Sequence, residues 1–418
     1  MENKTYVEIN AAKQMKALMK QHFMELDEAS RTKNKKIAWC SSVGPAELAM
    51  SLGFLVYYPE NHAAMLGSTR TAMDYIPTAN AHGYSPEICS YLTSDIGAYL
   101  RHETPLTKAY GIKEIPRPDV LLYNTNQCRD VGDWARFYGR EFNVPVLGIN
   151  TPHTQNDVRE PVVSSVAAQL REMVPELEKV AGRHFDIDEF REVLATSREC
   201  SDLWEAVLNT GANHPSPLSF FDECIHMGPA VVMRGRKEAT DYYRVLLAEM
   251  QERVAHGVAA VAGEKYRFYW EGMPVWGKLR SLSELLAGLK SCVVVSTYCN
   301  SWIFSKFDPA DPFQSMAEAY CSIFIGQDDN WKENYIADKV KHYAIDGILF
   351  HDARTCASNS NNRYGMTKRL SERLGIPHLV INGDLNDLRC YSEEQTMTNI
   401  EAFVEQIEES HRENIRRH

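Results

Sequence analysis

Short apolar runs alternate with longer stretches of helical periodicity over most of the chain. Each run is bounded by turn residues, as buried strands are. Strands that alternate with helices predict a parallel sheet covered by helices on both faces. The expected strands lie at residues 35–42, 53–59, 119–126, 145–150, 266–272, 292–299, 346–352 and 378–383.

The eight expected strands fall into two groups, separated by a helical stretch. We expect an α/β fold with two lobes, whose parallel sheets are flanked by helices, plus a helical segment between them. Residues 1–163 would form an N-terminal helix and the first lobe, residues 164–264 the helical segment, and residues 265–418 the second lobe. Within the helical segment, the prolines of residues 213–229 predict a loop. The last helix is expected over residues 393–418.

Composition excludes several classes of protein. The 418 residues carry a net charge of −11 and no long Lys/Arg run, which argues against a nucleic-acid or anionic-membrane surface. No apolar stretch approaches the ~20 residues of a membrane span, and the start lacks the apolar core of a signal peptide. We therefore expect a cytoplasmic protein. In that reducing compartment its ten cysteines would be thiols or metal ligands.

Six of the ten cysteines follow the ends of short apolar runs. In an α/β protein, ligands collect in the crevice outside the carboxyl ends of the strands. Cysteines that are far apart in the sequence but would all lie at this crevice predict one common ligand. Soft thiolates favour an iron–sulfur centre. The six are Cys40, Cys89, Cys128, Cys299, Cys356 and Cys390.

Two alternatives to an iron–sulfur centre stay open for the cysteines. Buried cysteine is a common small core residue, and this is our interpretation of the remaining four, Cys200, Cys224, Cys292 and Cys321. Zinc is the main competing metal, but its sites usually pair cysteines as CxxC, and the chain has no CxxC.

Several longer stretches resemble the 2-hydroxyacyl-CoA dehydratase and benzoyl-CoA reductase family, in the same order over nearly the whole chain. They are residues 39–65 (WCSSVGPAELAMSLGFLVYYPENHAAM), 83–91 (GYSPEICSY), 117–128 (RPDVLLYNTNQC) and 346–356 (DGILFHDARTC). The resemblance implies a [4Fe–4S] cluster on three cysteines, which match Cys89, Cys128 and Cys356. It also implies a serine and a glutamate beside the substrate, matching Ser42 and Glu60.

The chain departs from the dehydratase pattern by three further cysteines. Cys40, Cys299 and Cys390 would supply three more ligands, in the motifs WCSS, STYCNSW and NGDLNDLRC. This set is similar to the double-cubane cluster proteins, a branch of the same superfamily. That branch implies a homodimer with an [8Fe–9S] centre.

The chain contains no nucleotide-binding motif, since neither GxxxxGK[ST] nor GxGxxG occurs. This absence fits the resemblance, which implies a separate ATP-hydrolysing iron–sulfur activator that delivers electrons one at a time. The leading hypothesis is the catalytic component of an ATP-dependent reductase acting on a small molecule. The alternative is a dehydratase or benzoyl-CoA reductase subunit with one [4Fe–4S] cluster, and an electron carrier is a third class. A dense basic pocket for the 3′-phosphate of coenzyme A is not evident from the sequence.

Three side chains near the first strands could act on a substrate, and each has a structural alternative. Glu60 and His62 are candidate proton sources, or a helix-capping carboxylate and a packed imidazole. Ser42 could donate a hydrogen bond to the substrate or a cluster sulfide, or cap a helix. Arg354 could steady an anionic cluster or form a surface ion pair.

Overall fold

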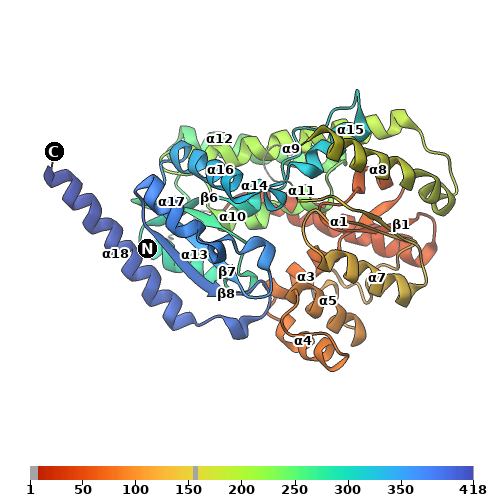
Figure 1. Cartoon of the computed structure of the whole chain (residues 1–418), viewed down its shortest axis with the longest axis horizontal. Coiled ribbons are helices and arrows are strands. Elements are labelled where there is room, and N and C mark those ends of the chain that lie inside the picture. The colour runs from red at the N-terminus through yellow and green to blue at the C-terminus, as the bar shows by residue number, and fades with distance from the viewer. Residues whose placement is uncertain (1–7, 154–158, 418) are drawn as a thin grey trace.

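The computed structural model describes residues 8–153 and 159–417, and it has the expected α/β architecture with two lobes (Figure 1). All eight predicted strands are present, in two four-stranded parallel sheets. The first sheet has the order β2-β1-β3-β4 and the second β6-β5-β7-β8. The strands are β1 (Ile37–Cys40), β2 (Leu55–Tyr57), β3 (Val120–Asn124), β4 (Val146–Ile149), β5 (Tyr266–Glu271), β6 (Ser291–Ser296), β7 (Gly347–Ala353) and β8 (His378–Gly383).

The two sheets repeat one topology, because the second strand of each half pairs with the first on the side away from the third. The chain therefore reverses its direction of winding between β1 and β3, and again between β5 and β7. A ligand crevice is expected at such a switch point, outside the carboxyl ends of the strands. The central strands β1 and β5 are buried along their whole length, as strands covered on both faces must be.

Helices cover both sheets and join the two lobes, with α9 and α12 packed together along the top of the view in Figure 1. In the first lobe the helices are α1 (Ala11–Thr32), α2 (Ala46–Ser51), α3 (Pro59–Ser68), α4 (Ala72–Ala81), α5 (Ser90–Leu100), α6 (Leu106–Tyr110) and α7 (Asp130–Phe142). Between the sheets lie α8 (Glu160–Ala181), α9 (Ile187–Asn209), α10 (Phe220–His226), α11 (Gly228–Val232) and α12 (Lys237–Ala255). The second lobe has α13 (Leu279–Gly288), α14 (Thr297–Asn300), α15 (Pro312–Cys321), α16 (Asp329–His342), α17 (Met366–Leu374) and α18 (Glu393–Arg417).

One sequence prediction was wrong in the helical segment. Residues 213–229 were expected to be a loop, but helix α10 begins within them, just after the prolines. Ser219 and Asp222 form a capping box, in which each side chain accepts a hydrogen bond from the other residue's backbone N–H. Pro215 and Pro217 precede α10 and Pro229 lies in the first turn of α11, so none of them interrupts the hydrogen bonds of α10. The domain boundaries stay a prediction, and the one after residue 163 falls within the first turn of α8.

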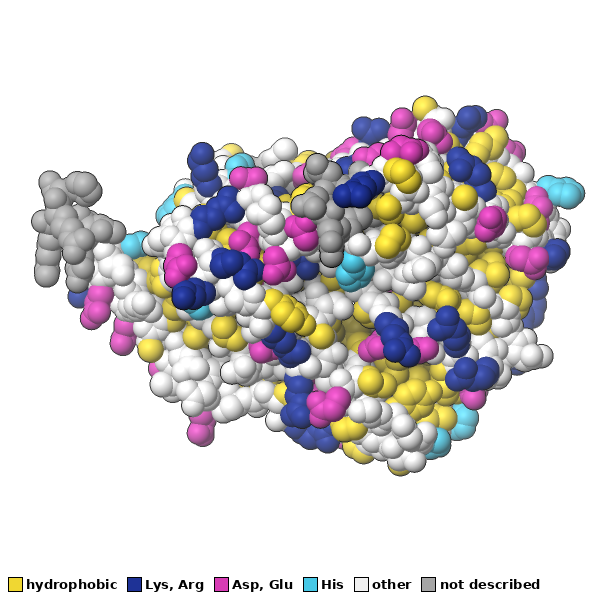
Figure 2. All heavy atoms as spheres, viewed as in Figure 1, with side chains coloured by type: hydrophobic (Ala, Val, Ile, Leu, Met, Phe, Trp, Pro, Cys, Tyr) yellow, Lys and Arg dark blue, Asp and Glu magenta, His cyan; other side chains and the backbone are white. Residues whose placement is uncertain are grey.

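The surface carries acidic and basic side chains interspersed over the face drawn in Figure 2. No helix in the described part of the chain has a segment both long and apolar enough to cross a bilayer.

Candidate active site between the two lobes

A cavity of about 550 Å³ lies where the two switch points face each other. Its walls include Ser42 after β1 and Cys128 after β3, together with Met273 after β5 and Cys356 after β7. Both lobes therefore contribute the turns that follow their central strands. This is the position at which α/β sheets bind ligands.

Three of the six predicted cysteines line this cavity, namely Cys89, Cys128 and Cys356. Cys89 is the N-cap of α5, Cys128 lies two residues before α7, and Cys356 is the N-cap of a short 3₁₀ helix at Ala357–Asn359. All three side chains are half-buried. Each thiol thus lies at the start of a helical turn, where backbone N–H groups are free to donate.

The three thiols share one pattern of hydrogen bonding. Each sulfur accepts a bond from the backbone N–H three residues further along the chain. The donors are Leu92 for Cys89, Val131 for Cys128 and Asn359 for Cys356. Backbone donors of this kind stabilise thiolate and tune the potential of an iron–sulfur cluster.

The same three thiols are neutral unless a cation joins them. Burial raises the pKa of Cys89, and the neighbouring Cys128 and Cys356 raise it further. The pKa of Cys128 rises to about 12 and that of Cys356 to about 11, in both cases chiefly through burial. Bound metal deprotonates a coordinating thiol, so iron would supply the missing positive charge. Each of the three thiolates could bind one iron of a cluster.

The relative position of Cys89 and Cys356 is fixed by Asp384, a buried carboxylate just after β8. The hydroxyl of Ser90 donates to one Asp384 oxygen, and the backbone N–H and hydroxyl of Thr355 donate to the other at 2.8 and 2.7 Å. Ser90 follows Cys89 and Thr355 precedes Cys356. A single side chain therefore joins the ligand turns of the two lobes.

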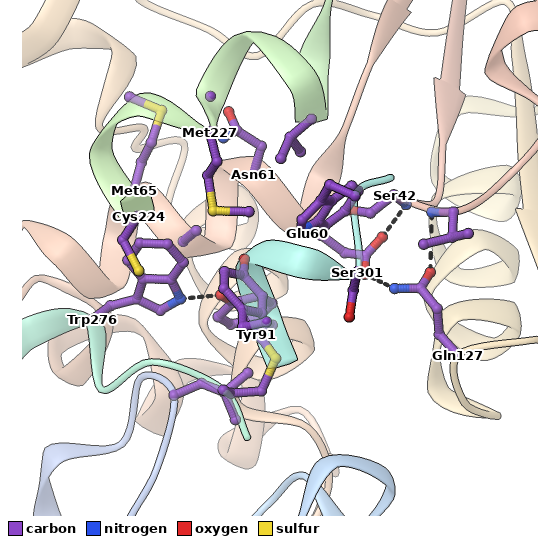
Figure 3. Close-up of a pocket in the computed structure, with 18 of the residues that line it drawn as sticks. Ser42, Glu60, Asn61, Met65, Tyr91, Gln127, Cys224, Met227, Trp276 and Ser301 are labelled. Atoms are coloured by element: carbon purple, nitrogen blue, oxygen red, sulfur yellow. Dashed lines mark hydrogen bonds between the residues drawn. The ribbon is translucent and has the colours of Figure 1, made fainter. Parts of the chain in front are cut away.

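The carboxylate of Glu60, in the first turn of α3, faces the cavity and is held by two donors. The backbone N–H of Ser42 donates to Oε2, and the Gln127 amide donates to Oε1 at 3.1 Å (Figure 3). Burial raises the pKa of Glu60, and the bonds from Ser42 and Gln127 oppose that rise. Glu60 therefore keeps its proton to higher pH than an exposed glutamate does.

The turn that presents Ser42 rests on a buried ion pair between Arg234 and Glu47. Nε of Arg234 donates to Glu47 Oε1 at 2.8 Å, and both side chains are almost fully buried. The Arg234 guanidinium also donates to the carbonyl oxygen of Gly44 at 3.2 Å. Because removing one partner would leave a buried charge, this pair fixes the turn firmly.

His62 does not line the cavity. Its Nδ1 lies 2.5 Å from Asp95 Oδ1 and its Nε2 lies 2.9 Å from the Thr104 hydroxyl. Asp95 also accepts a bond from the Trp134 indole at 2.9 Å. The His62 imidazole is therefore part of a buried hydrogen-bonding network with Asp95 and Thr104, and its role as a proton source stays a prediction.

Cys40 and Cys299 are not among the residues that line the cavity. The Cys40 sulfur is packed so closely against Gly44 that a Cβ built there would lie 2.7 Å from it. Cys299 is fully buried, and its thiol hydrogen-bonds with Cys224 and Ser296.

Cys390 also lies outside the cavity lining, on a surface turn at Leu388–Cys390. It is half-buried, and the Arg354 side chain hydrogen-bonds with its sulfur. Arg354 also forms an exposed ion pair with Glu87, at 2.7 Å. The structure thus brings three of the predicted cysteines to one cavity and leaves the other three apart.

Several cavity residues were not identified from the sequence. Gln127 was noted only as a polar neighbour of Cys128, and Cys224 was interpreted as structural. Tyr91 carried no signal beyond following Cys89. Asp384, which is not among the lining residues but joins the ligand turns, carried none beyond following β8. Adjacency to a cysteine could have indicated Gln127 and Tyr91, whereas Cys224 lies on the helix that was expected to be a loop.

Known proteins match almost the whole chain. A family model described as 2-hydroxyglutaryl-CoA dehydratase, D-component, covers residues 41–407. The (R)-2-hydroxyisocaproyl-CoA dehydratase alpha subunit of Clostridioides difficile is 30% identical over 91% of this chain and 92% of its own length. The (R)-phenyllactyl-CoA dehydratase alpha subunit of Clostridium sporogenes is 29% identical over 90% of each chain. A benzoyl-CoA reductase subunit of Thauera aromatica is 27% identical over 87% of this chain and 86% of that protein.

Proposed function

Because the chain belongs to the 2-hydroxyglutaryl-CoA dehydratase D-component family, we propose that it is a catalytic subunit of a 2-hydroxyacyl-CoA dehydratase. In this proposal Cys89, Cys128 and Cys356 hold one [4Fe–4S] cluster. The observation that carries it is the shared geometry of these three thiols, each facing the cavity and accepting a backbone N–H bond. The one-cluster alternative is preferred to the double cubane because Cys40, Cys299 and Cys390 lie outside that cavity lining.

The chemistry divides between the cluster and the protein. When bound, the cluster supplies one-electron transfer at low potential. Glu60, whose pKa is raised by burial, is placed to donate a proton to the hydroxyl group of the substrate; the C–O bond breaks and the hydroxyl group leaves as water. Gln127 and the Ser42 N–H hold the carboxyl group in place, and the Ser42 side chain lines the same cavity.

A coenzyme A thioester suits the opening of the cavity. Lys16 and Lys20 line it from α1, and both side chains are exposed. Ammonium groups in this position attract the phosphates of coenzyme A without being desolvated. Lys16 and Lys20, on one face of α1, would therefore provide the basic site for the phosphates of coenzyme A that was not evident from the sequence.

Electron delivery needs a second protein, and we assign this role to an ATP-hydrolysing iron–sulfur activator. The sequence contains neither of the phosphate-binding motifs GxxxxGK[ST] and GxGxxG. Arg129 and Arg354 adjoin the ligand cysteines Cys128 and Cys356, and their side chains are 91% and 58% exposed. An activator that docks over these turns would come within a short distance of the three sulfurs, and added salt should weaken such a partly polar contact.

Iron analysis of cysteine variants tests the cluster assignment. The protein purified without air should contain about four irons per chain. Cys89→Ser, Cys128→Ser and Cys356→Ser should each lose most of this iron, because a serine oxygen is a harder and poorer ligand. Cys299→Ser and Cys390→Ser are the matched controls and should keep it. About eight irons per chain, with loss of half in the Cys299 and Cys390 variants, would instead establish the double cubane.

A further inference from the structure

One side of the cavity is formed by aromatic side chains, which we call the aromatic wall: Tyr91, Trp276, Tyr298 and Trp302. The rings of Trp276 and Tyr298 meet edge to face with centroids 6.0 Å apart, and those of Tyr298 and Trp302 do the same at 6.5 Å. Three of the four are nearly fully buried, and Tyr298 is half-buried. The wall therefore offers a continuous apolar surface for a ligand.

Trp276 is held in one orientation. Its indole N–H donates to the hydroxyl of Tyr91, so the polar edge of the ring is satisfied within the wall. Gly67 of α3 packs behind it, and a Cβ built there would lie 2.9 Å from the Trp276 Cβ. A side chain fixed on both sides forms a rigid surface and does not rearrange to fit each ligand.

The cavity has a polar side and an apolar side. Glu60, Ser42 and Gln127 lie together on one side in Figure 3, whereas Trp276, Met65 and Cys224 lie on the other. Methionines complete the apolar lining, and their flexible thioethers adapt to groups of different shape. The methionines are Met15, Met19, Met65, Met227 and Met273.

Charge is distributed unevenly over the same lining. Among its described residues, the only cationic side chains are Lys16 and Lys20, both exposed on α1. Glu60 and Asp130 carry the only carboxyl groups among these described lining residues, and the Asp130 carboxylate accepts the backbone N–H of Cys89 at 3.1 Å. A carboxylate on the acyl group would meet no buried cation here, and burying an unpaired charge is strongly unfavourable.

We propose that the acyl group of the substrate is uncharged, apolar and bulky, either aromatic or branched aliphatic. This inference rests on the proposed function and specifies its substrate class. The acyl group packs against the aromatic wall, while its reacting carbons face Glu60 and the three thiols. A dicarboxylic acyl group is excluded by charge, and a short acyl group leaves the wall uncovered.

Equilibrium binding tests this specificity without catalysis. The full-length, iron-loaded protein is titrated calorimetrically, without air, with four thioesters that lack the 2-hydroxyl group and so cannot be dehydrated. The two bulky ligands, 3-phenylpropionyl-CoA and 4-methylpentanoyl-CoA, should each bind at least about tenfold more tightly than propionyl-CoA or glutaryl-CoA. Equal affinities, or tighter binding of glutaryl-CoA, would overturn the inference and leave the dehydratase assignment intact. Failure of all four thioesters and of free coenzyme A to bind would overturn both.

Variants locate the preference on the aromatic wall. Trp276→Ala should reduce the ratio of 3-phenylpropionyl-CoA to propionyl-CoA affinity by at least about fivefold, and Trp276→Phe should largely restore it. Tyr364→Ala, at a side chain that is 67% exposed and outside the cavity lining, is the control and should bind as the unmodified protein does. An unchanged ratio in Trp276→Ala contradicts the proposal.

Discussion

At the scale of single residues, the protonation of Glu60 should control turnover. Its pKa is raised by burial, so the carboxyl group keeps its proton to higher pH than an exposed glutamate. A proton donor with a raised pKa is active below that pKa, and its contribution is lost as the pH rises through it. Glu60→Gln removes the proton but keeps the shape, and should lower kcat by about 10²–10⁴-fold. In the unmodified protein kcat should fall as the pH rises through the pKa of Glu60, and this alkaline decrease should be absent in Glu60→Gln.

An exposed glutamate, Glu87, provides the control for this prediction. Glu87 is 61% exposed and pairs with Arg354 on the surface. Glu87→Gln should leave the pH profile unchanged, since an exposed ion pair contributes little. If Glu60→Gln kept full activity with the same profile, Glu60 would not be the proton donor.

At the scale of an element, the position of Cys89 depends on how α5 packs against α4. The two helix backbones are in close contact at Gly97 of α5, where there is no side chain. A Cβ built on Gly97 would lie 2.0 Å from the carbonyl oxygen of Tyr75 in α4. Gly97→Ala should therefore push the two helices apart and lower the free energy of unfolding by about 1–3 kcal/mol. Because α5 begins just after Cys89, iron content should fall as well. Urea unfolding and iron analysis, both without air, measure the two effects.

A second helical glycine separates this effect from general helix propensity. Gly288 lies in α13, and a Cβ there would have no neighbour within 4 Å. Gly288→Ala should leave the iron content unchanged and raise stability by at most about 1 kcal/mol. Equal behaviour of the two variants would show that the contact between α4 and α5 does not determine the position of Cys89.

At the scale of the whole molecule, the cluster site depends on how the lobes are docked. Asp384 accepts hydrogen bonds from Ser90 in one lobe and Thr355 in the other. Asp384→Asn replaces one accepting carboxylate oxygen by an NH₂ group. This group would face the N–H and O–H donors of Ser90 or Thr355 and could not accept from them, so the two ligand turns should separate. We expect loss of more than half of the iron and a destabilisation of about 3–5 kcal/mol, measured by metal analysis and urea unfolding.

The matched control is Asp387, three residues further along the same turn. Its side chain pairs with Arg389 on its own turn, at 2.7 Å. Asp387→Asn should keep its iron. Retention of iron in both variants would mean that docking of the lobes does not require Asp384.

The sequence by itself determined the fold class and part of the site. Apolar runs such as those of β5 and β6 form strands that are buried along their whole length in a parallel sheet covered by helices, so all eight strands were predictable. Residues that follow the central strands of either lobe gather at the switch points, and this reasoning predicted Cys128 and Cys356, whereas Ser42 came from the family resemblance. These features depend on local pattern and topology alone.

Only the tertiary structure decided which side chains meet. Cys40 is the last residue of the central strand β1, and its sulfur packs beside Gly44, because successive side chains of a strand point to opposite faces. His62, two residues from Glu60, turns to Asp95 because α3 directs neighbouring positions to different sides. Cys224 reaches the cavity on a helix whose capping box overrides the prolines before it. The direction of a side chain, unlike its position along the chain, is set by packing between the lobes. For this reason only three of the six cysteines line the cavity.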